Sequence, residues 1–478
     1  MNGNPESGST PKEGFCQASE SVRGTLEKTR FFERSDWLSF GATAALVLSV
    51  YLFTLAPDVT LGSSGAFSVG AMYAGVPVPP GYPLWTIYAH FFTLLPFSSV
   101  AWRAGLSSAI AGALTCGVIA LMASRGGPAL IEAISQPGKL RQGEIRALRV
   151  VSSCVAGMAF GFDGAFWRTA VVADPGPLRM LLFAIVLCLL MRWVHVPSRR
   201  RSLYGASFVY GLAFTNSQML LAAAPGLQLM VVFGHRKLIR DICMVNAVLF
   251  IACLMALRAG YLEASHDRGG KTNIFGILFF VVGVGSIVTC MAMIAGTRRL
   301  FTEWKTILNC GVMILLGLTV YLYEPVASMT NPPINWAYPR TPDGFLHLVT
   351  RGQFERLHPT SHLAGLVKQL QMCAEITVAE FGLLYVLVAL VPFYYLRRLD
   401  AYGRRWMMGL LAVYVSLALF IPLVLNPPRD ARGREHFMVS YSASHLVLAV
   451  WTGYGLVALG ALFTSSHRLT QSTAFNGN

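Results

Sequence analysis

The chain has 478 residues, of which 54% are hydrophobic and only 13% are charged. A soluble domain of this size would carry about a quarter charged residues, so the composition excludes an ordinary globular protein. Apolar runs of roughly twenty residues recur along the whole length, and they lack the apolar–polar alternation of membrane-barrel strands. The sequence therefore predicts an all-α polytopic membrane protein.

The predicted organisation is a membrane domain between two polar tails. Residues 1–36 are rich in Gly, Ser, Glu and Lys and predict a disordered tail without a cleavable signal peptide. Residues 37–464 form the membrane domain, and residues 465–478 form the second tail. Two runs are short, which leaves ten to twelve spans expected. The candidate spans are 37–56, 103–123, 149–164, 177–194, 203–214, 218–234, 242–258, 273–297, 306–323, 379–396, 407–425 and 444–463.

The formal net charge of +15 has two readings, a nucleic-acid binder or a membrane topology. No soluble module gathers the basic residues. With the N-terminus inside, roughly two thirds of the 38 Lys and Arg fall on the inner side, as the positive-inside rule requires. The charge therefore indicates cytoplasmic termini and no nucleic-acid partner.

The first outer loop, residues 57–102, contains more than a simple membrane hairpin needs. It carries Asp58, a turn at Gly62 to Gly65, a small-residue helix candidate and a Val-Pro-Pro-Gly-Tyr-Pro corner. The apolar stretch Pro83 to Leu95 is too short to cross a bilayer of about 30 Å, so it predicts an interfacial or re-entrant helix.

A second long outer loop is expected at residues 324–378. It contains an Asn-Pro-Pro corner at Asn331, and Asp343 to Arg356 predicts an amphipathic helix on the membrane surface. The nine cysteines form no close pairs and are expected to be small buried side chains. The outer histidines show no metal-ligand spacing, so no metal ligands are assigned.

Several motifs in order carry a family resemblance. They are APDVTLGSSG (56–65), GVPVPPGYPLW (75–85), AWRAGLSSAIAGAL (101–114), FWRTAVVADPGPLRMLLFAIVL (166–187), LAFTNSQMLLAAAPG (212–226), NPPINWAYPRT (331–341), RGQFE (351–355) and the Ser-His pair at 444–445. In these stretches the chain resembles a family of bacterial multi-pass membrane proteins, formerly a domain of unknown function. That family is grouped with protein O-mannosyltransferase-like proteins in the GT-C glycosyltransferase superfamily.

The resemblance implies a GT-C-like fold in the bacterial cytoplasmic (inner) membrane. It also implies an enzyme that takes a sugar from a polyprenyl-phosphate carrier. An acid in the first outer loop would act as a general base toward an acceptor hydroxyl, or would help to hold a divalent metal beside the phosphate. The carrier lipid is the implied partner, and the cofactor stays open.

This chain departs from the family pattern at its acids. The family's opening motif reads approximately Gly-Asp-Ser-Gly-Glu, but Ser63 and Ala66 stand where the two acids are expected. Val78 and Ser217 replace histidines, whereas Asp174 matches a usual glutamate. Catalysis by the usual residues therefore cannot be carried over.

Two acids remain as candidate catalytic residues. Asp58 is the acid left in the first loop, and it acts either as a base or as a solvated residue that ends a helix. Asp174 lies in a short outer loop, where a turn-forming role is the alternative. The candidate substrate-binding residues are Arg103, Arg168, Asn216, Gln218, Arg340 and Arg351. The arginines either bind a lipid phosphate or reach headgroups at span ends.

Three hypotheses follow. The first is a glycosyltransferase with a diverged acidic motif. The second is a catalytically degenerate scaffold that binds carrier lipid or partners an active paralogue. The third, a transporter, is disfavoured because the predicted spans hold almost no charge at mid-membrane.

Overall fold

The computed structural model describes residues 31–134, 140–259, 274–350, 359–360, 362–428 and 430–475. Within these ranges the regular structure is helical, and the two residues Val76 and Asn335 form an isolated bridge. The helices are α2 (Arg34–Thr54), α3 (Ser64–Met72), α4 (Pro83–Thr93), α5 (Val100–Ile134), α6 (Gln142–Gly161), α7 (Gly164–Ala170), α8 (Gly176–His195), α9 (Arg200–Asn216), α10 (Ala224–Gly234), α11 (Ile239–Arg258), α12 (Ile274–Thr297), α13 (Trp304–Leu318), α14 (Tyr323–Met329), α15 (Pro342–Val349), α16 (Leu363–Phe381), α17 (Leu383–Tyr394), α18 (Ala401–Leu425) and α19 (Ala431–Phe475), with short 3-10 turns η1 (Gln218–Ala223), η2 (Arg236–Leu238) and η3 (Thr319–Leu322).

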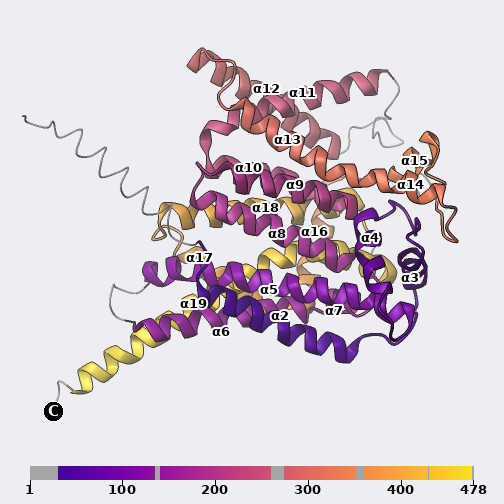
Figure 1. Cartoon of the computed structure of the whole chain (residues 1–478). Coiled ribbons are helices and arrows are strands. Elements are labelled where there is room, and N and C mark those ends of the chain that lie inside the picture. Colours follow the sequence, from indigo (N-terminus) through magenta and orange to yellow (C-terminus); the bar gives the residue numbers. More distant parts are fainter. Residues whose placement is uncertain are drawn as a thin grey trace, which may run out of the picture.

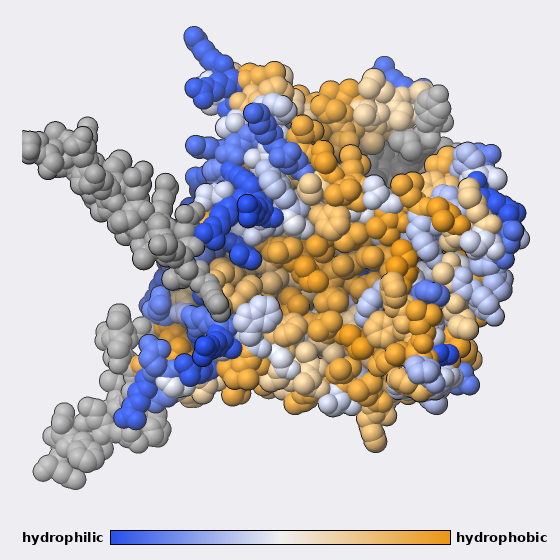
Figure 2. Space-filling view, in the orientation of Figure 1, coloured by the Kyte–Doolittle hydropathy of each residue, from blue (hydrophilic) through white to orange (hydrophobic). Residues whose placement is uncertain are grey.

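The length and polarity of these helices fit a membrane. Eight described helices are long and apolar enough to cross one, and the number reaches ten if two bent pairs each count as one span. Figure 2 shows a broad apolar band across the molecule, with hydrophilic residues concentrated at its two ends. The all-helical membrane fold is confirmed. Ten to twelve spans were predicted and eight to ten are found among the described residues, so the two ranges share only the value ten.

The core is built around α5, which packs against α2, α6, α8 and α19. Small residues allow this close packing, as is common between membrane helices. A Cβ added at Gly157 of α6 would lie 2.6 Å from the carbonyl oxygen of Cys116 in α5. The two backbones therefore touch, and a larger residue at position 157 would force them apart.

One end of the bundle, on the left in Figure 1, holds the starts of α2 and α6. It carries Arg34, Arg141, Arg146 and Arg149, and we call it the basic end. There Arg149 forms ion pairs with Asp36 at 2.7 Å and with Glu33 at 2.8 Å. Ser124 also donates a hydrogen bond to Asp36, at 2.6 Å. The hydrogen bond from Arg149 lowers the pKa of Glu33. These contacts tie the first helix to α5 and α6.

Two helix pairs are bent rather than straight, α6 with α7 by 74° and α16 with α17 by 105°. At the first bend Asp163 accepts hydrogen bonds from the amides of Ala165 and Phe166, in the first turn of α7. Its other carboxyl oxygen lies 2.8 Å from Nδ1 of His445, and both side chains are at most 1% exposed. His445 lies 282 positions away in the sequence, so this buried pair joins the bend to α19.

The opposite end, which we call the loop end, is formed by α3, α4, α14 and α15 (Figure 1). The two long loops pair there, since the Val76 amide donates to Ile334 and the Trp336 amide donates to Val76, both at 3.1 Å. The predicted short helix after Pro83 is present as α4. The predicted amphipathic helix is present as α15 up to Val349, while residues 351–358 lie outside the described residues.

Candidate functional site

The turn between α7 and α8 holds the first candidate acid, Asp174. Its carboxylate Oδ1 accepts a hydrogen bond from the Gly176 amide at 2.6 Å. The Asp174 amide donates to Ser108 Oγ at 3.1 Å, and that hydroxyl donates back to the Asp174 carbonyl at 2.9 Å. These bonds fix the turn against α5. The side chain keeps partial access to the surface, yet burial in dense surroundings raises its pKa to about 6.

A cation, Arg179, lies one turn further along α8. Its Nη2 donates to the Val439 carbonyl of α19 at 2.7 Å. Its Nε is buried and has no hydrogen-bond partner among the described residues. A Cβ added at Gly176 would meet Asp174 Oδ1 at 2.7 Å and Arg179 Nη2 at 3.7 Å. The acid and the guanidinium therefore flank one glycine, and the small residue at 176 lets them approach.

Two of the predicted substrate-binding residues, Asn216 and Gln218, have side-chain amides that bond to neighbouring loops. Asn216 is 1% exposed and donates through Nδ2 to the Pro175 carbonyl at 2.9 Å. Its Oδ1 is buried without a partner among the described residues. Gln218 donates to the Val349 carbonyl at 2.7 Å, so it joins η1 to the end of α15. The end of α9 therefore brings Asn216 to the Asp174 turn.

A second acid, Glu324 of α14, was missed as a site residue by the sequence interpretation. It is 0% exposed, and neither carboxyl oxygen has a hydrogen-bond partner in the described part of the chain. Leaving a charged group buried and unpaired is costly, and such groups gather at functional sites. The signal in the sequence was an acid directly after an apolar run, which is by itself a functional hypothesis in a membrane protein.

The Pro-Pro-Gly-Tyr-Pro corner of the first loop packs directly on Glu324. A Cβ added at Gly81 would lie 2.2 Å from Glu324 Oε1, and Gly81 has a φ of +97°. Only glycine satisfies both the close approach and this left-handed conformation without strain. Helix α4, which begins directly after this corner, packs against α9 and against η3, which leads into α14. The corner therefore connects the Glu324 region with the Asp174 turn.

The remaining predicted residues lie in different surroundings. Asp58 is exposed and accepts a hydrogen bond from the Val59 amide at 2.8 Å. Arg103 donates to the carbonyls of Thr93 and Leu95, so it holds the end of α4.

The other predicted arginines are at the surface or outside the description. Arg168 is exposed on α7. Arg340 donates to Asn331 Oδ1 at 2.6 Å and lies over the Tyr338 ring at 5.4 Å. Arg351 lies outside the described residues.

The diverged motif of the first loop starts α3. Ser63 is the residue before that helix and Gly62 has a φ of +90°, so the glycine turn is present although its expected acids are not. Among the described residues, no group of three His, Cys, Asp or Glu side chains is placed to hold a metal ion. We therefore derive no chemistry from a divalent metal.

The arrangement around Asp174 suits proton transfer beside an anion. A carboxyl group whose pKa is near 6 is mostly ionised at neutral pH and still basic enough to accept a proton. A neighbouring guanidinium can stabilise phosphate oxygens, and a buried amide can bind a hydroxyl.

Comparison with known proteins agrees with the resemblance over part of the chain. Residues 63–240 match the family model of the protein O-mannosyl-transferase TMEM260 N-terminal domain. Over 184 residues the chain is 28% identical to protein O-mannosyl-transferase TMEM260 of Mus musculus. That alignment covers 38% of this chain and 23% of the mouse protein. No solved structure matches the chain.

The matched stretch includes Asp174, Arg179 and Asn216, whereas Asp58 and Glu324 lie outside it. The side chains that gather at the α7–α8 turn thus come largely from the part with known relatives. In that part, this multi-pass membrane protein is similar to the N-terminal domain of a protein O-mannosyl-transferase.

Proposed function

We propose that this protein is a membrane glycosyltransferase that moves a sugar from a polyprenyl-phosphate carrier to an acceptor hydroxyl at the loop end. Mannose is the first candidate sugar, because the mouse relative is described as a protein O-mannosyl-transferase. The observation that carries the proposal is the Asp174 carboxyl, with its raised pKa, beside Arg179 in the matched stretch.

In the proposed reaction, Asp174 accepts the proton of the acceptor hydroxyl as that oxygen attacks the anomeric carbon of the sugar. The new carbon–oxygen bond forms while the bond from the anomeric carbon to the carrier phosphate breaks. The phosphate leaves with the electron pair. Arg179 stabilises the negative charge that develops on it, in the manner of preorganised cations in other transfer enzymes.

The remaining polar groups have positioning roles in this proposal. Asn216 holds the Asp174 turn through Pro175 and presents its buried Oδ1 to a sugar or acceptor hydroxyl. Glu324 and the Gly81 corner shape the neighbouring wall. The proposal includes a GT-C-like scaffold in a bacterial inner membrane, with the loop end on the outer side and both termini in the cytoplasm.

The test uses purified full-length protein, polyprenyl-phosphate mannose and a Ser/Thr-containing acceptor peptide. Asp174→Asn preserves the size of the side chain but removes the base, so transfer is expected to fall by about 10²–10⁴. Asp58→Asn is the matched control, since it makes the same change at an exposed aspartate. We expect a much smaller effect there.

Two outcomes would contradict catalysis at this site. Equal transfer by wild type and Asp174→Asn would remove Asp174 from the reaction. Carrier binding without transfer by the wild-type protein would instead support the degenerate scaffold, for which the neutral Ser63 and Ala66 are the motivation.

A further inference from the structure

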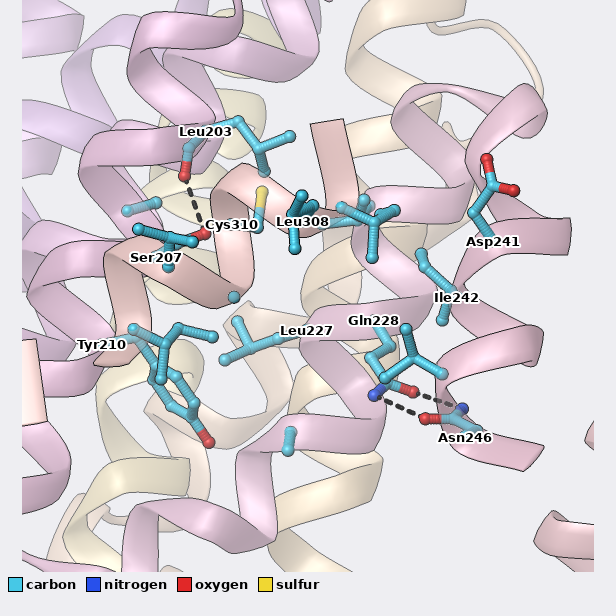
Figure 3. A pocket seen from close by; sticks show the side chains of 18 of the residues that line it. Leu203, Ser207, Tyr210, Leu227, Gln228, Asp241, Ile242, Asn246, Leu308 and Cys310 are labelled. Carbon is cyan, nitrogen blue, oxygen red and sulfur yellow. Dashed lines mark hydrogen bonds between the residues drawn. The ribbon is translucent and has the colours of Figure 1, made fainter. Parts of the chain in front are cut away.

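A large apolar cavity lies between α8, α9, α10, α11 and α13 (Figure 3). Its volume is about 590 Å³, within the range of roughly 300–1,000 Å³ that is usual for small-molecule sites. Leu203, Tyr210, Leu227, Ile242, Leu308 and Leu315 are among its lining residues.

The cavity is separate from the Asp174 turn. The helix α8 begins next to that turn and ends at His195, and its 20 residues span about 30 Å. Only the second half of α8 contributes to the cavity, through Val186 and Leu190. The cavity therefore lies toward the basic end.

The walls of the cavity continue onto the apolar surface of the molecule. Helix α11 packs mainly on α12 and only slightly on α13, which leaves a lateral opening between α11 and α13. Val245 and Leu315 line the cavity and are also 42% and 64% exposed. In a membrane this opening faces lipid chains rather than water.

The polar groups in the cavity wall satisfy one another. Gln228 of α10 and Asn246 of α11 exchange two hydrogen bonds, at 3.1 and 2.9 Å (Figure 3). The Asp241 carboxylate accepts from the amides of Thr302 and Glu303, at 3.2 and 2.5 Å. The interior therefore favours an apolar occupant, because its amides and its carboxylate already have partners.

The rim at the basic end has a surplus of positive charge. The Glu303 carboxylate pairs with Arg200 at 2.5 Å and with His235 at 2.9 Å. Arg240 is 3% exposed, and its Nε has no hydrogen-bond partner among the described residues, as is also the case for Nη1 of Arg200.

Two further cations near this rim, Arg299 and Lys305, are exposed at the surface. Arg299 is exposed, and its carbonyl accepts a hydrogen bond from Arg240. Lys305 is exposed next to Trp304, which itself lines the cavity. Glu303 is neutralised by Arg200, whereas Asp241 is bonded only by uncharged amides. Arg240, Arg299 and Lys305 still outnumber Asp241, so the rim keeps a net positive charge that attracts an anion.

We propose that this cavity is a binding site for an anionic phospholipid, with one hydrocarbon chain in the cavity and the phosphate headgroup at the Arg- and Lys-rich rim. An apolar cavity that opens sideways to the bilayer is filled most favourably by a lipid chain. Each Lys or Arg near the headgroup raises the preference for a negatively charged lipid about fivefold. This site does not depend on the proposed sugar transfer.

The experiment places purified full-length protein in nanodiscs that contain phosphatidylglycerol and phosphatidylcholine in equal amounts. Native mass spectrometry then counts the lipids retained after extraction. Two favourable cations predict a preference for phosphatidylglycerol of roughly tenfold or more.

Gly311→Phe is the blocking variant. Gly311 lines the cavity, and a Cβ there meets nothing within 4 Å, so phenylalanine can enter the space without displacing backbone. Gly285→Phe is the matched control, because Gly285 is exposed on α12 and also has open space around a Cβ. We expect Gly311→Phe to lose most retained phosphatidylglycerol and Gly285→Phe to retain it.

The charge of the rim is tested separately. Lys305→Gln is expected to reduce the preference for phosphatidylglycerol over phosphatidylcholine, whereas Arg258→Gln at the far end of α11 is not. Phosphatidylglycerol brominated on its acyl chains should also quench the fluorescence of Trp304, and the quenched fraction should fall in Trp304→Phe. This second measurement does not need the blocking variant to fold.

Either of two results would overturn the proposal. One is wild-type retention of phosphatidylglycerol by Gly311→Phe with no Trp304 quenching. The other is equal retention of the two lipids by the wild-type protein, which would leave the rim without a role.

Discussion

Two buried acids, one at each end of the bundle, have opposite surroundings. At the basic end, Asp36 is buried but has Arg149 and Ser124 as partners. At the loop end, Glu324 is equally buried with both oxygens unpaired in the described part of the chain, and Asp174 has a raised pKa. A paired buried acid holds helices together, whereas an unpaired buried acid and a raised carboxyl pKa are typical of sites that carry out chemistry.

The largest expected effect on stability comes from removing the buried acid at the basic end. Asp36→Ala leaves the Arg149 guanidinium buried without its closest partner, so the free energy of unfolding should fall by about 3–5 kcal/mol. Thermal unfolding in detergent measures this loss. Glu33→Gln is the control, since that side chain is 56% exposed, and exposed pairs contribute about 1 kcal/mol or less. Equal effects of the two changes would contradict the assignment of Asp36 as the buried anchor.

The next effect tests the corner at the loop end. Gly81→Ala places a Cβ against Glu324 and imposes a left-handed backbone on alanine, which costs of order 1–3 kcal/mol. We expect a lower unfolding temperature and reduced transfer. Adding Glu324→Ala removes the clash but not the backbone strain, so the double variant should recover only part of the stability. An unchanged single variant would mean that the corner does not press on Glu324.

The smallest effect is a gain of stability at the proposed site. The raised pKa of Asp174 means that the folded protein favours its protonated form, so stability is lost as pH rises from about 4 through about 6. Asp174→Asn removes that loss and should gain on the order of 1 kcal/mol above pH 6, after allowance for partial solvent access. At low pH the gain should vanish. Unfolding temperatures across this pH range measure the difference, and Asp58→Asn should show no such pH-dependent gain.

Much of the fold could be predicted from the sequence, because a membrane imposes apolar runs of a fixed length. The same reasoning identified α4, which is too short to cross, and the corner before it. The bend at Asp163 could not be found this way, since it depends on His445 of the last span. Local patterns carry no information about contacts between distant segments.

The candidate site was predictable only in part, for the same reason. Asp174 and Asn216 were identified from their motifs, and the structure brings them together at one turn. Glu324 was assigned to the start of a loop, and only its contact with Gly81 reveals how it is buried. The lipid cavity depends on the imperfect packing of α11 on α13, which no sequence period encodes.

The most direct test of the central claim is the pH dependence of kcat/KM for sugar transfer by wild type and Asp174→Asn. If Asp174 is the base, the wild-type value should rise with pH through about 6 and then level off, as the carboxyl ionises. The Asn variant should be slow and lack this rise. A wild-type profile that is flat between pH 5 and 7, or an Asn variant with the wild-type profile, would contradict the account.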